Sequence, residues 1–349
     1  MTLLWFDGFG SYQNYTDMLA IYDSAYTHMP SGVTTGRNAG MAVRFDSSSG
    51  QITKSFEDKP QTLIAGVAFR VSSVSSISDP GVTDYQIFKI EDDANNKHLF
   101  FHFIPGGAIE VVNSSNVALA TSDSGLLAYD DVWYYIEIKA TISNTVGQIT
   151  VKLNEIEVIN TTANLDTCNG SNEYAYLLRV GEINGSGINY FSDFYVCDDS
   201  GSTNNDFLGD IRVDVLRPDG AGTYTDFTPS AGANYENVDE AYPNDDTTYN
   251  DSQDVAAGEQ DSYAMESLDV LGTTIHGVKD QITVRKTDSG HREVKMLTIQ
   301  GGSDYLGDTI VLSDSYVTHA RIMEDNPDDA AAFVEADITA GEVGVEVTV

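Results

Sequence analysis

The stretch WYYIEIKATI (133–142) alternates large apolar residues with a second, more polar set. Successive side chains of a β-strand point to opposite faces, so this period of two predicts a strand with one face on a core. The core face would carry Tyr134, Ile136, Ile138, Ala140 and Ile142. The opposite face would carry Trp133, Tyr135, Glu137 and Lys139.

Other segments of the first 200 residues repeat this strand signal. TLIAGVAFRV (62–71) has the same period, and Pro105-Gly106-Gly107 provides a turn between two later strands. No helix of convincing length interrupts the series, which favours a β-sandwich over β-α-β units. The further predicted strands are HLFFHFI (98–104), Gly147–Leu153, Ile156–Asn160, YAYLLRVGEI (174–183) and YFSDFYVCD (190–198).

At 349 residues the chain exceeds one ordinary domain. The polar stretch DDSGSTNND (198–206) is the best candidate for a boundary, because Gly, Ser and Asn clusters are typical of linkers. The sequence therefore predicts an all-β protein with two jelly-roll-like β-sandwich domains in tandem. The expected domains are a jelly roll over 1–198, a linker over 199–206 and a second sandwich over 207–349.

The charge balance is strongly acidic: 18 Lys and Arg face 54 Asp and Glu, a formal net charge of −36. Such a field repels nucleic acid and anionic membrane surfaces, so neither is an expected partner. The negative charge either serves solubility alone or favours the binding of cations or of a basic partner. The first residues lack a basic secretory n-region and no apolar run reaches bilayer length, so we expect synthesis in a host cytoplasm without membrane insertion.

Sequence patterns of known catalytic sites are missing. A Glu-x-Asp-x-x-Glu strand of the glucanase type, a Gly-x-Ser-x-Gly elbow and a phosphate-binding Gly-rich loop are not found. Glu155 and Glu157 are the nearest carboxylate pair, but Glu155 falls at a turn. A protein without enzymatic activity is therefore expected.

An acidic loop in the second half offers a metal-site hypothesis. Asp239, Glu240, Asp245 and Asp246 lie close in sequence, and Ca²⁺ takes six to eight oxygen ligands from flexible loops of this kind. The alternative is a solvated acidic loop, since the regular Asp-x-Asp-x-Asp-Gly pattern is absent. Calcium is the one cofactor that the sequence suggests, and other cofactors are not expected.

The same loop contains three tyrosines, Tyr235, Tyr242 and Tyr249. Exposed aromatic rings can stack on sugars or anchor a protein partner. The alternative is that they cover the end of the sandwich.

The order of several motifs resembles a known family. These are Phe6-Asp7-Gly8-Phe9, VAFRVSS (67–73), SDFYVCDDSGSTNNDFLGDIRV (192–213) and VLRPDGAGTYTDFTPSAG (215–232). Together they resemble a concanavalin A-like or laminin-G-like jelly roll, followed by a second β-sandwich module, of tailed-bacteriophage virion structural proteins. One departure is Phe227, where the resembling stretch often has Trp.

The resemblance implies a component of the particle exterior: a capsid decoration, head-fibre or tail-associated protein located on the virion. It implies other virion proteins as partners, self-association (a trimer for a fibre), and contact with host glycans. A glycan-binding adhesin or receptor-binding protein is the alternative function. A glycoside hydrolase on a concanavalin-like fold is the second alternative.

Overall fold

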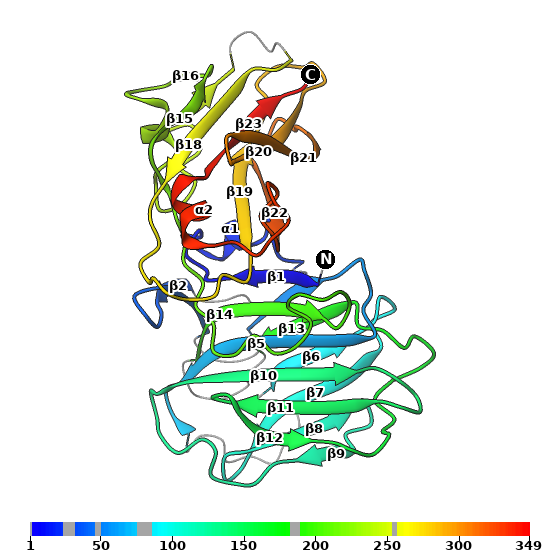
Figure 1. Ribbon diagram of the computed structural model, residues 1–349. Coiled ribbons are helices and arrows are strands. Elements are labelled where there is room, and N and C mark those ends of the chain that lie inside the picture. Colours follow the sequence, from blue (N-terminus) through cyan, green and yellow to red (C-terminus); the bar gives the residue numbers. More distant parts are fainter. Residues whose placement is uncertain (1, 24–31, 46–49, 75–85, 182–188, 253–256) are drawn as a thin grey trace. The chain divides into compact units, whose positions relative to one another are not determined.

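The computed structural model describes residues 2–23, 32–45, 50–74, 86–181, 189–252 and 257–349. Antiparallel sheets dominate this part of the chain (Figure 1), and its α-helices are short: α1 (Tyr15–Met18) and α2 (Glu335–Ala340). The prediction of an all-β fold built from β-sandwich domains is confirmed. None of the helices in the described ranges is long and apolar enough to cross a membrane.

The chain folds into two compact units. Unit 1 contains Met1–Phe9 and Gln13–Val213, and unit 2 contains Gly10–Tyr12 and Asp214–Val349. The segment 199–206, expected as a linker, belongs to unit 1, and the division between the units follows Val213. Each unit has its own sheets.

Unit 1 has an eight-stranded sheet in which β5 and β14 are central. The residues of β14 before its bulge pair with β3 and those after it pair with β1, so two short strands share one edge of β14. The strands in spatial order are β12 (Ile156–Asn160), β11 (Gln148–Leu153), β10 (Trp133–Thr141), β5 (Thr62–Val71), β14 (Asn189–Asp198), β3 (Met41–Phe45) and β2 (Gly32–Thr35), with β1 (Leu3–Asp7) also on β14.

The second sheet of unit 1 has six strands. Their spatial order is β4 (Gln51–Ser55), β13 (Leu177–Gly181), β6 (Gln86–Glu91), β7 (Lys97–Ile104), β8 (Ala108–Asn113) and β9 (Ala118–Thr121).

The core of unit 1 lies between these two sheets. The ring of Phe69 on β5 is 5.3 Å from the ring of Phe103 on β7 and 5.6 Å from the ring of Tyr134 on β10. The predicted core face of 133–142 is buried throughout, which confirms the alternation. Trp133, Tyr135, Glu137 and Lys139 therefore belong to the outer face of the eight-stranded sheet.

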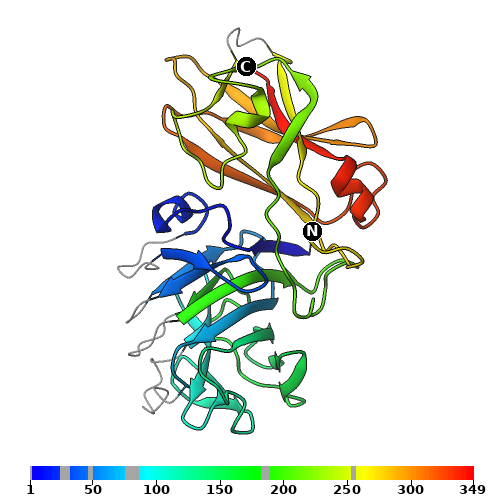
Figure 2. The ribbon, with the colours of Figure 1, turned by 90° about the vertical axis from the view of Figure 1, so that its left-hand side faces the viewer.

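Unit 2 is a smaller sandwich. One core cluster consists of Val294, Val345 and Val347, and Ile282 and Val284 of a two-stranded sheet pack against it. Leu297 and Phe333 of this unit are also buried. In Figure 2, α2 (red) lies at one edge of this unit. The five-stranded sheet has the order β15 (Pro218–Thr225), β18 (Gln260–Met265), β23 (Glu342–Val347), β20 (Glu293–Gln300) and β21 (Ser303–Val311). The smaller pieces are β19 (Val278–Val284) with β22 (Val317–Met323), β16 (Thr228–Pro229) with β17 (Asn250–Asp251), and the 3₁₀-helix η2 (Asn234–Asn237).

Candidate functional site

The outer face of the eight-stranded sheet is organised around a glycine in β5. A Cβ atom at Gly66 would lie 2.2 Å from Cε1 of Tyr195 and 2.9 Å from Cε1 of Tyr135. Both distances are shorter than any side chain tolerates, so only glycine lets the two rings lie over β5. Both rings are buried, which means that something covers this part of the sheet.

The cover is the segment 206–213, which we call the strap. The backbone N–H of Leu208 donates to the Tyr195 hydroxyl at 3.1 Å, and that of Gly209 donates to Oε1 of Glu137 at 2.8 Å. The N–H of Val213 donates to Oδ1 of Asp193 at 2.9 Å. The strap is therefore hydrogen-bonded to the face that it crosses.

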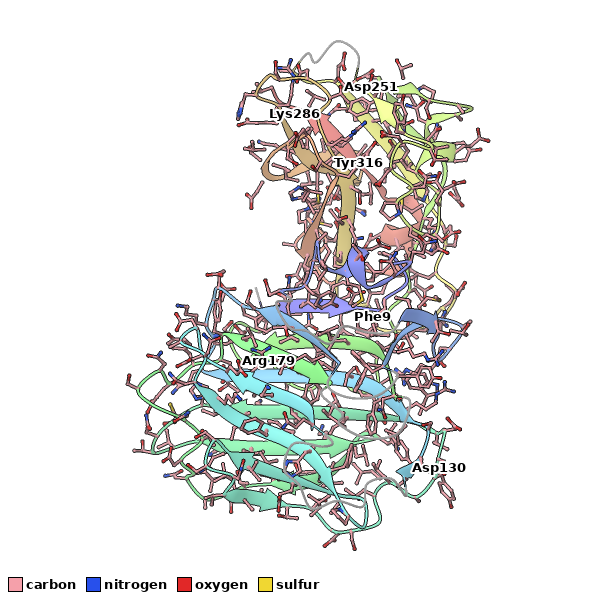
Figure 3. All side chains as sticks on the ribbon, turned by 180° about the vertical axis from the view of Figure 1, so that it is seen from behind. Phe9, Asp130, Arg179, Asp251, Lys286 and Tyr316 are labelled. Atoms are coloured by element: carbon pink, nitrogen blue, oxygen red, sulfur yellow. The ribbon has the colours of Figure 1, made fainter. Side chains whose placement is uncertain are left out.

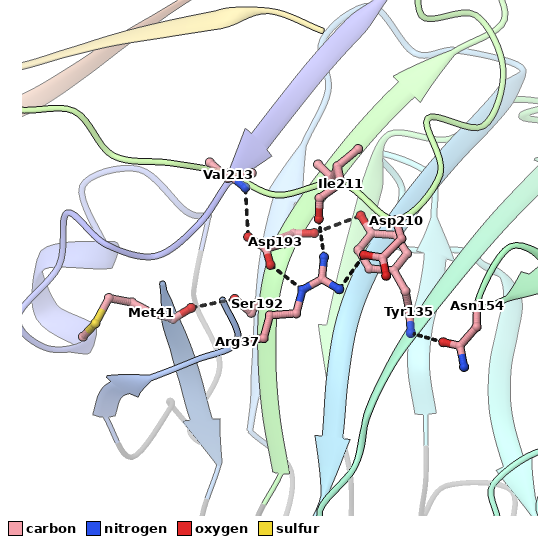
Figure 4. Close-up of polar contacts among 9 residues, drawn as sticks. All are labelled: Arg37, Met41, Tyr135, Asn154, Ser192, Asp193, Asp210, Ile211 and Val213. Atoms are coloured by element: carbon pink, nitrogen blue, oxygen red, sulfur yellow. Dashed lines mark hydrogen bonds and ion pairs between the residues drawn. The ribbon is translucent and has the colours of Figure 1, made fainter. Parts of the chain in front are cut away.

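An arginine ties the strap down further (Figure 4). Nε of Arg37 lies 2.5 Å from Oδ2 of Asp193, and its other nitrogens contact Asp210 and the carbonyl of Ile211, both on the strap. Burial raises the pKa of Asp193 above its usual value, with Arg37 acting in the opposite direction. This cluster is structural, because its charged atoms are used within the fold.

Glu137 has the same role in the middle of the face. Its Oε1 accepts hydrogen bonds from the Tyr195 hydroxyl at 2.5 Å and from the Gly209 N–H. Burial raises the pKa of Glu137, although these two hydrogen bonds favour the ionised form. A buried carboxylate with a raised pKa resembles a catalytic acid, but here it fastens the strap.

Beyond the strap, the outer face opens into a groove of about 350 Å³. Side chains of β10, β11 and β12 and the start of the strap line it: Lys139, Thr141, Gln148, Thr150, Lys152, Glu157, Asp206 and Phe207. Strand register places Thr150 opposite Lys139 and Gln148 opposite Thr141, so neighbouring strands present polar groups side by side.

Two lysines shape one wall of the groove. Nζ of Lys139 lies 3.2 Å from Oδ1 of Asp206, and Nζ of Lys152 lies 4.3 Å above the Phe207 ring. Partial burial acts to raise the pKa of Asp206, but hydrogen bonds from the Phe207 N–H and from Lys139 outweigh it and hold this pKa below its usual value. Asp206 is therefore ionised at neutral pH.

The outer face of the six-stranded sheet carries buried charges. Arg179, labelled in Figure 3, makes a bidentate contact with Glu91, with Nε to Oε1 at 3.1 Å and a terminal nitrogen to Oε2 at 2.8 Å. Nearby strands bring Nε2 of His102 within 3.2 Å of Oε2 of Glu110. Burial lowers the pKa of His102, with Glu110 opposing, so the imidazole is neutral at pH 7.

The four predicted calcium ligands do not converge. Oε1 of Glu240 accepts a hydrogen bond from Asn244 at 2.8 Å, and Oδ1 of Asp246 pairs with Arg285 at 2.6 Å. Asp239 and Asp245 are exposed. Over the described ranges, no group of three or more His, Cys, Asp and Glu side chains could hold a metal ion. Calcium binding stays a prediction.

The three predicted recognition tyrosines differ in exposure. Tyr249 is 42% exposed, whereas Tyr235 and Tyr242 are half-buried, and Tyr235 belongs to η2. Their role in binding also stays a prediction. The sequence reading missed Trp133 as a functional candidate, although it had assigned this residue to the outer face.

Comparisons with known proteins give low similarities. No family model matches the sequence, and no curated protein matches it. The receptor-binding domain of botulinum neurotoxin mosaic serotype C/D matches with a TM-score of 0.36 at 12% identity, over 49% of this chain and 41% of that one. The binding domain of Paraclostridial Mosquitocidal Protein 1 matches with a TM-score of 0.37 at 11% identity, over 56% and 48%.

A third similar structure is a carbohydrate esterase, vb_24B_21, from the Shiga toxin-encoding bacteriophage phi24B. Its TM-score is 0.31 at 14% identity, over 49% of this chain and 87% of that one. This chain spans less than half the length of the two toxin domains that it matches. At these values the similarities carry no functional argument.

Proposed function

We propose that the protein is a non-enzymatic surface-recognition protein that binds carbohydrate on the outer face of its eight-stranded sheet. The observation that carries the proposal is the polar groove beside the strap. Jelly rolls also serve as lectin and viral capsid domains, which is an analogy of fold only.

The lining of the groove matches the chemistry of a sugar. Sugar hydroxyls both donate and accept hydrogen bonds, and Thr141, Thr150 and Gln148 offer both functions. Lys139 and Lys152 add donors, and Glu157 and Asp206 add acceptors. The ring of Phe207 gives an apolar surface for the C–H face of a sugar ring.

The pKa values of the carboxyl groups on this face favour binding of a sugar over its hydrolysis. Most glycoside hydrolases use a carboxylic acid that donates a proton beside a second, ionised carboxylate. Asp206 in the groove has a lowered pKa and is a poor proton donor at neutral pH. Glu137 and Asp193, whose pKa values are raised, are used in holding the strap.

The test is a glycan array carrying bacterial surface polysaccharides, probed with the full chain. We expect binding that is lost in the double variant Gln148→Ala/Thr150→Ala, which removes two groove side chains without touching the core. Thr145→Ala, an exposed threonine in the turn before β11, is the matched control and should bind like the wild type. An array without signal from a folded wild-type protein would exclude carbohydrate recognition.

The finer part of the proposal is that the protein stands on the exterior of a tailed-phage particle. Its support is the sequence resemblance, which covers nearly the whole chain, and the acidic charge, which suits an exposed part. Self-association is expected, because particle components follow symmetry and repetition strengthens single weak contacts. Mass spectrometry of purified particles should detect many copies of the chain, and its absence from them would refute this location.

One observation favours a second function, cleavage of a glycan. His102 is neutral, lies 3.2 Å from Glu110, and its Nδ1 is buried with no hydrogen-bond partner in the described part of the chain. A neutral imidazole beside a carboxylate can serve as a general base. Lys89 and Arg179 lie on the same face of neighbouring strands, and both contact Glu91 there.

Cleavage is tested by incubating the protein with host polysaccharide and measuring released reducing ends. An active enzyme should lose release in His102→Gln, while Gln148→Ala/Thr150→Ala should weaken only binding. No release by the wild type, with Ca²⁺ present, would remove this second function.

A further inference from the structure

Four residues form a row across the outer face of the eight-stranded sheet, at the end away from the groove. Trp133 of β10 is opposite Arg70 of β5, Arg70 is opposite Tyr190 of β14, and Tyr190 is opposite Arg44 of β3. Directly opposed residues share a face, so an aromatic ring and a guanidinium alternate along the row. All four side chains are half-buried, so each keeps some surface in contact with solvent.

Arg70 is held between two rings. Its Cζ atom lies 4.0 Å from the centroid of the Tyr190 ring and 5.3 Å from that of Trp133. The two rings are themselves 6.5 Å apart at an angle of 60°. Cation–π contacts with the two rings orient the guanidinium of Arg70. Its N–H groups lie in the guanidinium plane and therefore do not point at the ring faces.

Arg70 also differs from other arginines of unit 1 in its partners. Arg37 pairs with Asp193, and Arg179 pairs with Glu91. In the described part of the chain, no carboxylate lies within 4.0 Å of Arg70, and its buried Nε has no hydrogen-bond partner. In a chain with 54 acidic and 18 basic residues, an arginine without a carboxylate calls for an explanation.

The chemistry of an oriented guanidinium selects the missing partner. Its N–H groups form a planar fork that matches the two oxygens of a carboxylate, and the resulting charge-assisted hydrogen bonds are stronger than neutral ones. The flanking rings offer apolar surface for the C–H groups of a sugar. We propose that Arg70, held between Trp133 and Tyr190, binds the carboxylate of an acidic saccharide; this inference rests on the proposed carbohydrate recognition and names its ligand class.

The net charge of the protein also bears on the form of the ligand. Uronic and sialic acid polymers carry the carboxylates that a guanidinium binds. Because the whole protein carries a charge of −36, a ligand with isolated, spaced charges is repelled less than a dense polyanion.

Trp133 provides a direct signal for the test. The chain has two tryptophans, and Trp5→Phe leaves Trp133 as the only one. This single-tryptophan protein is titrated with alginate oligosaccharides and with polysialic acid, each beside its carboxyl-reduced, neutral form. We expect the Trp133 fluorescence to change on addition of an acidic oligosaccharide, with an affinity that falls as salt rises.

Variants of Arg70 distinguish binding of an acidic saccharide from carbohydrate binding in general. Arg70→Gln should lower the affinity for the acidic oligosaccharide at least tenfold and leave the affinity for the neutral form unchanged. Arg70→Lys should retain part of the affinity for the acidic form, because lysine keeps the positive charge but lacks the planar, bidentate donor geometry of the guanidinium. Arg292→Gln, which removes an arginine paired with Asp288 in unit 2, is the control and should bind like the wild type. Circular dichroism and the melting temperature confirm folding, and Arg70→Lys replaces Arg70→Gln should the latter not fold.

The outcomes are distinct. Equal affinity for acidic and neutral forms, or acidic binding that survives Arg70→Gln, would overturn the acidic-ligand inference while carbohydrate recognition stands. No binding of any form, together with a blank glycan array, would overturn both. Loss of neutral binding in Arg70→Gln would mean that Arg70 only supports the sheet, which also contradicts the inference.

Discussion

The two units achieve the same class of fold by different means. Unit 1 buries aromatic rings between two broad sheets, and Phe69, Phe101, Phe191 and Phe194 are almost fully inaccessible to solvent. In unit 2 the described buried apolar side chains are fewer and mostly aliphatic, and every position of β15 and β22 is at least partly exposed. They include Val294, Met296, Leu297, Ile299, Val345 and Val347, with the rings of Tyr263 and Phe333. A sandwich with less apolar burial depends more on its internal hydrogen bonds and ion pairs.

Unit 2 contains buried polar clusters, as expected for a unit that depends more on hydrogen bonds and ion pairs. Asp280 of β19 accepts a hydrogen bond from Thr298 at 2.5 Å and one from Arg321 at 2.9 Å, and so joins the two-stranded sheet to the five-stranded one. Burial raises the pKa of Asp280, and Arg321 opposes that effect. Asp261 forms a second cluster with Asn234 and Tyr263.

The largest effect is expected from Arg321→Met in unit 2. Methionine keeps much of the side-chain volume but leaves Asp280 buried without a counter-charge, which costs about 3–5 kcal/mol in typical buried pairs. Chemical denaturation gives the free energy, and hydrogen exchange shows which strands lose protection. We expect the loss in β19, β20 and β22.

The control for this prediction is the double variant Asp280→Asn/Arg321→Met. Removing both charges leaves no isolated ion, so stability should return in large part. Equal stability of the single and double variants would show that the ion pair is unimportant and that unit 2 depends on its apolar contacts as unit 1 does.

A smaller effect is expected in unit 1 from Gly66→Ala. The added Cβ collides with the buried rings of Tyr195 and Tyr135, and overpacking of this kind costs about 1–3 kcal/mol. Gly32→Ala is the matched control, because Gly32 lies in the same sheet with open space around its Cα. Protection should fall in β5, β10 and β14 for the first variant only; equal protection in both would contradict the packing of the rings over β5.

Much of unit 1 follows from sequence periodicity. The strand 133–142 and its buried face were predicted, because alternation is a local pattern that survives in the fold. The Asn154-Glu155 turn has both residues at positive φ (49° and 65°), as a two-residue hairpin requires.

The strap and the row across β10, β5, β14 and β3 were not predictable. Both depend on which strands become neighbours, and those neighbours are far apart in sequence: Trp133, Arg70 and Tyr190 meet only through register. The polar composition of 199–206 predicts a linker, whereas Asp206 accepts a hydrogen bond from Lys139. A polar composition indicates contact with solvent, but it does not indicate hydrogen-bond partners that are distant in the sequence.

The effect of pH should distinguish the strap of unit 1 from its apolar core. The pKa of Glu137 is raised in the folded protein above its ordinary value of 4.5, so the folded state binds the proton more tightly than the unfolded state does. Its contribution is therefore greatest below pH 4.5 and is lost as pH rises through the raised pKa. On acidification from neutral pH, wild type should gain more stability than Glu137→Gln.

Melting temperatures of both proteins between neutral pH and about pH 5 measure this difference. The charge of −36 also decreases on acidification, but it does so in both proteins and cancels in the comparison. Parallel curves would mean that the pKa of Glu137 is the same in the folded and unfolded states, which would contradict the raised pKa.

The smallest effect is expected at Phe227, where the family that the chain resembles often has Trp. Phe227 packs against the valine cluster of unit 2 but is only half-buried, so a larger ring can extend toward solvent without displacing Val294 or its neighbours. Phe227→Trp should therefore change the free energy of unfolding by less than about 1 kcal/mol, the range of substitutions that avoid a closed core. Chemical denaturation followed by hydrogen exchange in β20 and β23 measures it. Overpacking of a closed site can cost about 2 kcal/mol or more, and a loss of this size would show that the core of unit 2 is as tightly filled as that of unit 1. The contrast between the two units would then rest on their polar clusters alone.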